Sequence, residues 1–191
     1  MSPLIPLFSW REKDLKAQKL YGAIVAQTRL PVFYQGFGVP DTLEGRFVVL
    51  SFNLFAVLHR LKADGAETRG FAQELTDQFT ADMETVLREL GVGDLGIPKK
   101  MRGLAASSAA LLQGYDEASE IGESALKALP LERPAAEAAS ERLADYLKGV
   151  IRRLDTEPLS VLQTGEVKFP EINMEFREMA PRKAENFGKK G

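Results

Sequence analysis

The sequence predicts an all-α fold: a single compact multi-helix domain with a long central apolar helix and an irregular C-terminal tail. Apolar residues recur at spacings of three or four along most of residues 14–154, which is the period of an amphipathic helix. No run of alternating apolar and polar residues is long enough to predict a sheet. The 191 residues are 45% hydrophobic and 27% charged, which suits one domain that buries a core.

The first predicted helix covers residues 14–28, where apolar side chains gather on one side. Pro31 follows, and proline ends a helix because it lacks a backbone donor and clashes with the preceding turn. Residues 32–40 then form an aromatic connector with at most one short helical turn. This irregular stretch leaves its aromatic side chains free to line an exposed groove.

The central helix is predicted from Asp41 to about Ala63. Asp41 is the expected N-cap, and Glu44 stands three residues later, as in a capping box. From 47 to 58 the helix is apolar on nearly every side, which predicts that other elements surround it. Gly65 is the expected stop.

The next predicted helix, 68–90, is the clearest amphipathic segment, and Gly91 follows where a left-handed C-terminal residue is expected. Gly91, Gly93 and Gly96 spell G-x-G-x-x-G. A dinucleotide site needs a strand before these glycines, whereas a long predicted helix precedes them here. We therefore interpret the segment 91–101 as a corner between two helices.

Charged residues make this corner distinctive. Lys99, Lys100 and Arg102 place three positive charges at the start of the next helix, where the helix dipole disfavours cations. An acidic partner would explain that placement, and solvated surface charge is the alternative. Asp94 is the acidic side chain that the corner offers to a partner.

Further helices are predicted at 98–115, 121–129 and 135–154. After Asp155, prolines and glycine punctuate the chain, and Val161, Leu162 and 167–169 are expected to dock as extended chain. The resulting organisation is a helical domain at 10–154, an extended segment docked on it at 155–172, and a mobile tail at 173–191.

The composition argues against an enzyme. The chain has no cysteine, which excludes disulfides, thiolate metal sites and cysteine nucleophiles. His59 is the single histidine and lies on the apolar helix, where a core or helix-edge role outweighs metal binding or catalysis. The net charge of −2 gives no general attraction to nucleic acid. We expect no catalytic residues, no cofactor and no metal ion.

The chain is expected in the cytoplasm, with peripheral action at the inner membrane left open. Its start, 1–10, has no basic region before a short apolar part that two prolines interrupt, so it is a poor signal peptide. The longest apolar stretch, 47–58, is shorter than the roughly 20 residues that a bilayer span needs.

Two blocks of sequence resemble one known family. The first block comprises 20–29, 31–34 and 38–47, and the second comprises 82–83 and 88–101. In combination they resemble the ubiquinol–cytochrome c chaperone family, and residues 115–116 and 165–170 are similar to its weaker later elements. The likeness covers about 20–170. Ser107, Ser108, Ala109 and Ala110 stand where bacterial members often have an aromatic-Gly-Arg element, and the last twenty residues match nothing in the family.

The resemblance implies an all-α assembly factor that binds newly made cytochrome b during assembly of the respiratory bc1 complex. Mitochondrial members do so with a small partner protein, near the ribosome. This chain shows no evident mitochondrial presequence and resembles the bacterial members. The expected partners are therefore cytochrome b or another membrane-protein client, a small partner subunit and the ribosome, without nucleic-acid specificity. Two alternatives remain open: a helical lipid- or small-molecule-binding protein, and a general protein-interaction module.

The expected partner-binding residues come from the family blocks, the aromatic connector and the charged corner. They are Arg29, Phe33, Tyr34, Asp94, Lys99, Lys100 and Arg102.

Overall fold

The computed structural model describes residues 6–63, 65–103 and 131–172, and in this part of the chain every regular element is helical. The elements are α1 (Pro6–Thr28), the π-helical turn η1 (Val32–Gly36), α2 (Leu43–Ala63), the 3-10 turn η2 (Gly65–Thr68), α3 (Arg69–Glu89), α6 (Arg133–Asp155) and α7 (Leu159–Gln163). Residues 97–103 are also helical. The predicted all-α class is confirmed. The predicted helix 121–129, the end of 98–115 and the tail 173–191 lie outside the described residues.

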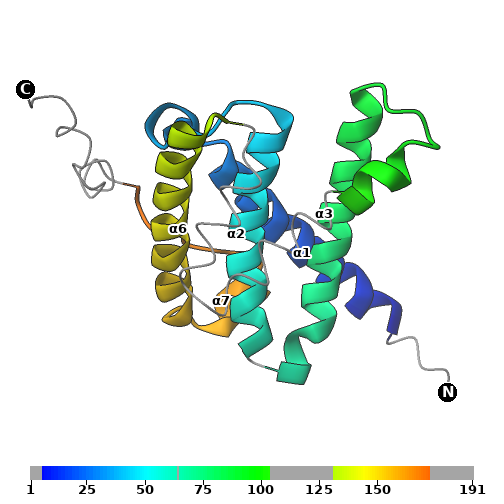
Figure 1. Ribbon diagram of the computed structural model, residues 1–191. Helices are drawn as coiled ribbons and strands as arrows, with labels where there is room; N and C mark the ends of the chain where they lie inside the picture. Colours follow the sequence, from blue (N-terminus) through cyan, green and yellow to red (C-terminus); the bar gives the residue numbers. More distant parts are fainter. Residues whose placement is uncertain (1–5, 64, 104–130, 173–191) are drawn as a thin grey trace, which may run out of the picture.

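Helix α2 is the centre of the fold and packs against α1, α3 and α6 (Figure 1). Its residues 47–54 are all buried, and Ala56, Val57 and Leu61 extend the buried set toward its C-terminal end. The all-round apolarity of this segment therefore has the predicted cause, because three helices take up its different sides.

The start of α2 is held by Thr42 rather than by Asp41. The backbone N–H of Gly45 donates to Thr42 Oγ1 at 3.2 Å, whereas the Asp41 carboxylate pairs with Arg46 at 2.6 Å. The predicted Asp41 cap is therefore wrong, since the neighbouring hydroxyl takes its place. Gly45 lies so close to the Pro40 carbonyl that a Cβ atom at this position would overlap the oxygen.

Helix α1 begins at Pro6 rather than at the predicted residue 14. Proline is tolerated in the first turn of a helix, where its missing N–H would have had no partner. The single turn predicted for the connector is confirmed as η1.

Helix α3 ends at the predicted glycine. Gly91 has φ +80°, its N–H donates to the Arg88 carbonyl at 2.9 Å, and the Val92 N–H donates to the Leu87 carbonyl at 3.0 Å. These two bonds form a Schellman motif, which satisfies carbonyls that a helix end leaves free. The segment 91–101 is thus a corner between two helices, as predicted, and no strand precedes its glycines.

A buried hydrogen-bond network joins α1, α2 and α6. The Tyr146 hydroxyl donates to Asn53 Oδ1 at 2.7 Å and accepts from Gln27 Nε2 at 3.1 Å. Asn53 Nδ2 also donates to Thr28 Oγ1 at 3.3 Å. Burial raises the pKa of Tyr146, so its hydroxyl stays protonated as the donor.

The segment after α6 is partly helical. Val161 and Leu162 lie in α7, so the expectation that they dock as extended chain is wrong, whereas residues 165–172 carry no helix. Gly165 has φ +81°, and a Cβ atom there would press on the Lys16 carbonyl of α1. Lys19 then donates to Glu166 at 2.9 Å, so glycine and an ion pair hold this segment against α1.

Candidate functional site

The structure places the predicted partner-binding residues in two regions. Arg29 and Tyr34 lie where α1, η1 and the start of α2 meet, and Asp94, Lys99, Lys100 and Arg102 are exposed on the corner after α3. Phe33 belongs to neither surface.

Phe33 is fully buried, so the expectation that it lines an exposed groove is wrong. Its ring meets the Phe37 ring edge-on, with 5.5 Å between centroids, and the Tyr146 ring at 5.0 Å. Arg142 of α6 also donates to the Phe37 carbonyl at 3.1 Å. The connector aromatics therefore anchor η1 to α6 and leave Phe33 without exposed surface for a partner.

A small pocket opens between α1, α2 and α3, and we call it the Arg29 pocket. Its volume is about 170 Å³. Its lining residues are Val25 and Thr28 of α1, Arg29 directly after α1, Leu43, Arg46, Phe47 and Leu50 of α2, and Asp82, Met83 and Val86 of α3. Most of these side chains are apolar, and the charged ones are Arg29, Arg46 and Asp82.

A hydrogen bond beside the pocket joins α1 to α3. The Tyr21 hydroxyl donates to Asp82 Oδ2 at 2.7 Å. Burial, and then the bond to Asp82, raise the pKa of Tyr21, so the hydroxyl remains a donor at neutral pH. The Asp82 carboxylate at the pocket wall is therefore already engaged.

Arg46 is engaged as well. Its Nε lies 2.6 Å from Asp41 Oδ1, and its guanidinium lies over the Tyr34 ring at 5.2 Å from the centroid. The bond to Asp41 raises the pKa of Arg46, and burial raises the pKa of Tyr34, whose hydroxyl donates to the Thr28 carbonyl at 2.8 Å. Tyr34 thus positions Arg46 at the mouth of the pocket.

Arg29 is the remaining charge. Its side chain is exposed and makes no hydrogen bond or ion pair with any residue that the structure describes. An unpaired guanidinium beside an apolar pocket can bind a carboxylate through two parallel N–H donors. The geometry therefore suits an apolar group with a negative charge near it.

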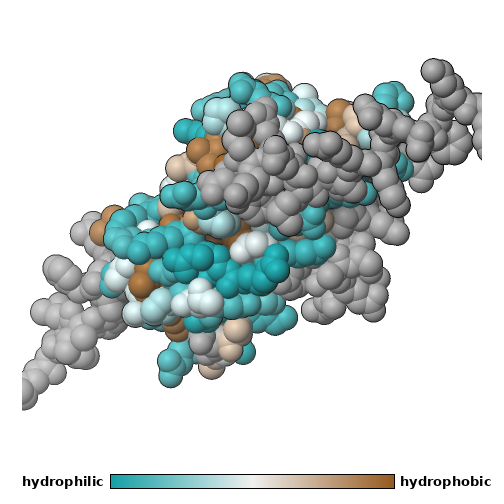
Figure 2. All heavy atoms as spheres, turned by 90° about the vertical axis from the view of Figure 1, so that its left-hand side faces the viewer, coloured by the Kyte–Doolittle hydropathy of each residue, from teal (hydrophilic) through white to brown (hydrophobic). Residues whose placement is uncertain are grey.

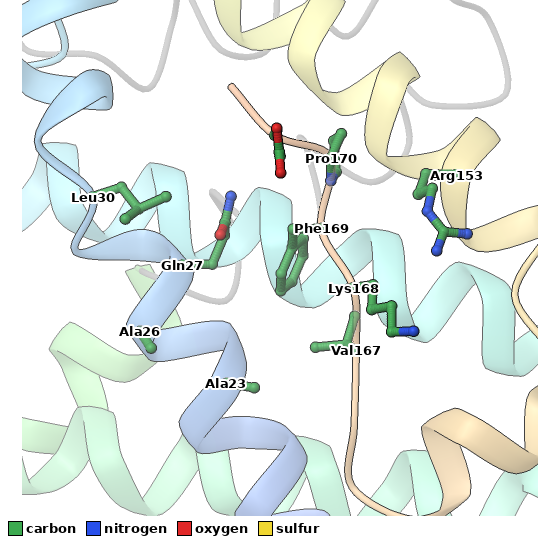
Figure 3. A pocket seen from close by; sticks show the side chains of 10 residues that line it. Ala23, Ala26, Gln27, Leu30, Arg153, Val167, Lys168, Phe169 and Pro170 are labelled. Atoms are coloured by element: carbon green, nitrogen blue, oxygen red, sulfur yellow. The ribbon is translucent and has the colours of Figure 1, made fainter. Parts of the chain in front are cut away.

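A second, more open groove lies between α1, α6 and the segment 165–172, with a volume of about 810 Å³. Phe169 lies in its middle, Leu30 stands at one side, and Arg153 and Lys168 lie together at the other (Figure 3). Gln27 lines this groove and also bonds to Tyr146, so the groove floor is tied to the buried network.

The corner carries the most exposed apolar side chain described. Leu95 is 99% exposed, and Leu90, at the end of α3, is 60% exposed. Asp94 is held only loosely, with its carboxylate 3.8 Å from Arg88 Nε. The three predicted cations and Leu95 thus form a small charged and apolar surface, separate from the Arg29 pocket.

Other surfaces offer less. Figure 2 shows the side of the molecule on which α6 lies, and hydrophilic side chains cover most of its described surface. Among residues 6–63, 65–103 and 131–172 there is no group of acidic or histidine side chains that could hold a metal ion. No helix within those ranges is long and apolar enough to cross a membrane.

The sequence prediction missed Leu43, Arg46, Asp82 and Met83 as site residues. The signal was present, because all four belong to the two blocks that resemble the chaperone family, at 38–47 and at 82–83. Segments some forty residues apart in the sequence converge on one pocket in the fold.

Comparisons with known proteins agree on one family. The family model described as ubiquinol-cytochrome C chaperone matches residues 35–169. The "Ubiquinol-cytochrome-c reductase complex assembly factor 1" of Xenopus laevis is 25% identical over 165 residues, which cover 83% of this chain and 82% of that protein. The crystal structure of the Cbp3 homolog from Brucella abortus is similar with a TM-score of 0.72 and 28% identity, and the match covers 94% of this chain and 100% of that one.

Proposed function

The chain belongs to the ubiquinol–cytochrome c chaperone family, and from this premise we propose that it binds newly made cytochrome b for assembly of the bc1 complex. The Xenopus relative is named as an assembly factor of the ubiquinol–cytochrome-c reductase complex, which supports the same role here. A chaperone acts by holding a client, so this role needs a binding surface and no catalytic group.

One observation supports a particular client-binding surface on the molecule. The two family blocks converge on the Arg29 pocket, where apolar walls from three helices stand beside a guanidinium that has no side-chain partner among the described residues. A folding core alone does not require an exposed arginine at the rim of an apolar pocket. We infer that the client contacts this pocket, with Arg29 as the polar contact.

We also propose that the protein works at the cytoplasmic side of the inner membrane, beside the ribosome that makes its client and with a small partner subunit. The charged and apolar corner at 91–103 and the groove beside α1 supply further surfaces for these contacts.

Deletion of the gene tests the role. We expect the bc1 complex, measured by blue native electrophoresis and by the reduced-minus-oxidised spectrum of haem b, to fall in the deletion strain and to return with the wild-type gene. Normal bc1 levels in the deletion strain would contradict the proposal. In parallel, affinity purification of the tagged protein from membranes is expected to recover cytochrome b, and an untagged strain is the control.

The groove in Figure 3 favours one alternative, because its volume of about 810 Å³ falls in the range of roughly 300–1,000 Å³ of small-molecule sites. A lipid- or small-molecule-binding protein would retain its ligand in native mass spectrometry. We expect the mass of the bare chain. A bound lipid or quinone would favour the alternative, and a pull-down without any membrane protein would favour a general interaction module.

A further inference from the structure

We propose that the Arg29 pocket receives a single large apolar side chain of the client, and that Arg29 pairs with a carboxylate next to that side chain in the client sequence. The inference rests on the proposed function, because it assumes a polypeptide client. It adds the chemistry that the client segment must carry.

The size of the pocket selects one side chain. Its volume of about 170 Å³ is close to the roughly 150 Å³ of an apolar protein cavity that accepts one benzene molecule. Drug-sized ligands and cofactors occupy roughly 300–1,000 Å³. Leucine, isoleucine, methionine and phenylalanine side chains therefore fit, whereas a quinone or a lipid is too large.

The walls favour apolar anchors without strict selection among them. Leu43, Phe47 and Leu50 line the pocket from α2, and Met83 and Val86 line it from α3. Methionine is unbranched and flexible, so it adapts to differently shaped partners, and such side chains are common on promiscuous binding surfaces. The pocket thus recognises a class of side chain, not one residue.

The charges select the neighbour of the anchor. Three charged side chains line the pocket: Arg29, Arg46 and Asp82. Arg46 pairs with Asp41, and Asp82 accepts a hydrogen bond from Tyr21, so both already have a partner within the chain. Of these three, only the Arg29 side chain has no partner among the described residues. A client carboxylate can form an ion pair with Arg29, whereas a client lysine or arginine at the same place would be repelled by its like charge.

Such a pair occurs at a particular place in a membrane protein. Carboxylates are costly in the apolar interior of a bilayer, so in a membrane-spanning client an apolar residue beside an acid is expected at the ends of the spans and in the adjoining loops rather than in their middles. The pocket therefore binds the ends of client spans, which emerge into water, and leaves their apolar middles to other surfaces.

The test is an NMR titration of the full chain with capped dipeptides. The probes are N-acetyl-Leu-Asp-amide, N-acetyl-Leu-Asn-amide and N-acetyl-Ala-Asp-amide at millimolar concentration. We expect Leu-Asp to shift the amides of 25–29, 43–50 and 82–86, and to bind about two- to fivefold more tightly than Leu-Asn, the range for an ion pair at an exposed rim. Ala-Asp is expected to bind more weakly than both, because it lacks the anchor.

Matched variants complete the test. Arg29→Gln, at an exposed position, is expected to bind Leu-Asp and Leu-Asn equally. Lys62→Gln, an exposed cation in the last turn of α2, is expected to keep the wild-type preference. No shift at the lining residues, shifts confined to 167–171, or equal binding of the two leucine probes to the wild type would each overturn the proposal.

The outcomes also separate this inference from the proposed function. A wild-type preference for Leu-Asp together with normal bc1 levels in the deletion strain would support the binding chemistry of the pocket and refute cytochrome b as the client. Loss of the bc1 complex in the deletion strain without any preference for Leu-Asp would support the role in bc1 assembly and refute the binding chemistry of the pocket.

Discussion

The buried hydroxyl of Tyr146 gives the sharpest prediction about stability. Tyr146→Phe removes the donor to Asn53 Oδ1 at 2.7 Å and the acceptor of Gln27 Nε2. Asn53 is fully buried, so its oxygen is left without a partner, and such an atom costs about 1–3 kcal/mol. Gln27 lines the open groove and can turn to water, so it adds little. We expect a loss of about 2 kcal/mol in the free energy of unfolding.

The control is Tyr34→Phe. The Tyr34 hydroxyl donates to the Thr28 carbonyl at 2.8 Å from a half-buried position, so its loss is expected to cost about 1 kcal/mol or less. Urea unfolding followed by circular dichroism at the helical band gives both free energies. For a chain of this size, about 2 kcal/mol corresponds to a fall in Tm of roughly 4–8 °C. Equal stability of the two variants would refute the claim that the buried network is worth more than a half-exposed bond.

Three further predictions concern close contacts and pH. Gly45→Ala forces a Cβ atom onto the Pro40 carbonyl, and we expect the free energy of unfolding, measured by urea titration, to fall by about 2–3 kcal/mol. Gly165→Ala combines φ +81° with a clash on Lys16, and limited proteolysis is expected to cut residues 165–172 faster while α1 to α3 stay protected. The pKa of Tyr21 is raised in the folded state, so its contribution is complete below the unfolded value of 10.0 and is lost as the pH rises above it. Urea titrations should therefore show stability falling above pH 10, and falling less steeply in Tyr21→Phe; a flat wild-type curve would contradict this.

Local patterns predicted the helices because each signal lay within a few residues of the feature it reports. Gly91 marks the end of α3 through its own φ and the bonds around it, and the apolar run 47–58 marks the central helix. The cap of α2 shows the limit of such signals. Asp41 and Thr42 are adjacent and both can cap a helix; in the structure α2 begins at Leu43, so Thr42 takes the cap and Asp41 pairs with Arg46.

Long-range contacts account for most of what the sequence concealed about the site. Phe33 looks exposed within an irregular connector, but Tyr146 of α6 covers it from more than a hundred positions away. Arg29, predicted from the sequence to bind a partner, has an exposed side chain, whereas the pocket beside it exists only once α3 packs across α1 and α2. A local residue pattern therefore predicts a helix, whereas a pocket between helices depends on which other helices pack against it.

The modest size of the Arg29 pocket has a consequence for how a chaperone of this kind holds its client. Burial of one leucine side chain contributes roughly 1.5–3 kcal/mol and an exposed ion pair roughly 0–1 kcal/mol. These two contributions sum to at most about 4 kcal/mol, which corresponds to about millimolar binding even before the cost of association is subtracted, so the pocket alone binds no better than that. Retention of a client therefore needs several weak surfaces engaged together, because a second contact on the same chain becomes intramolecular. We propose the pocket between α1, α2 and α3, the groove beside α6 and the corner after α3 as three such surfaces.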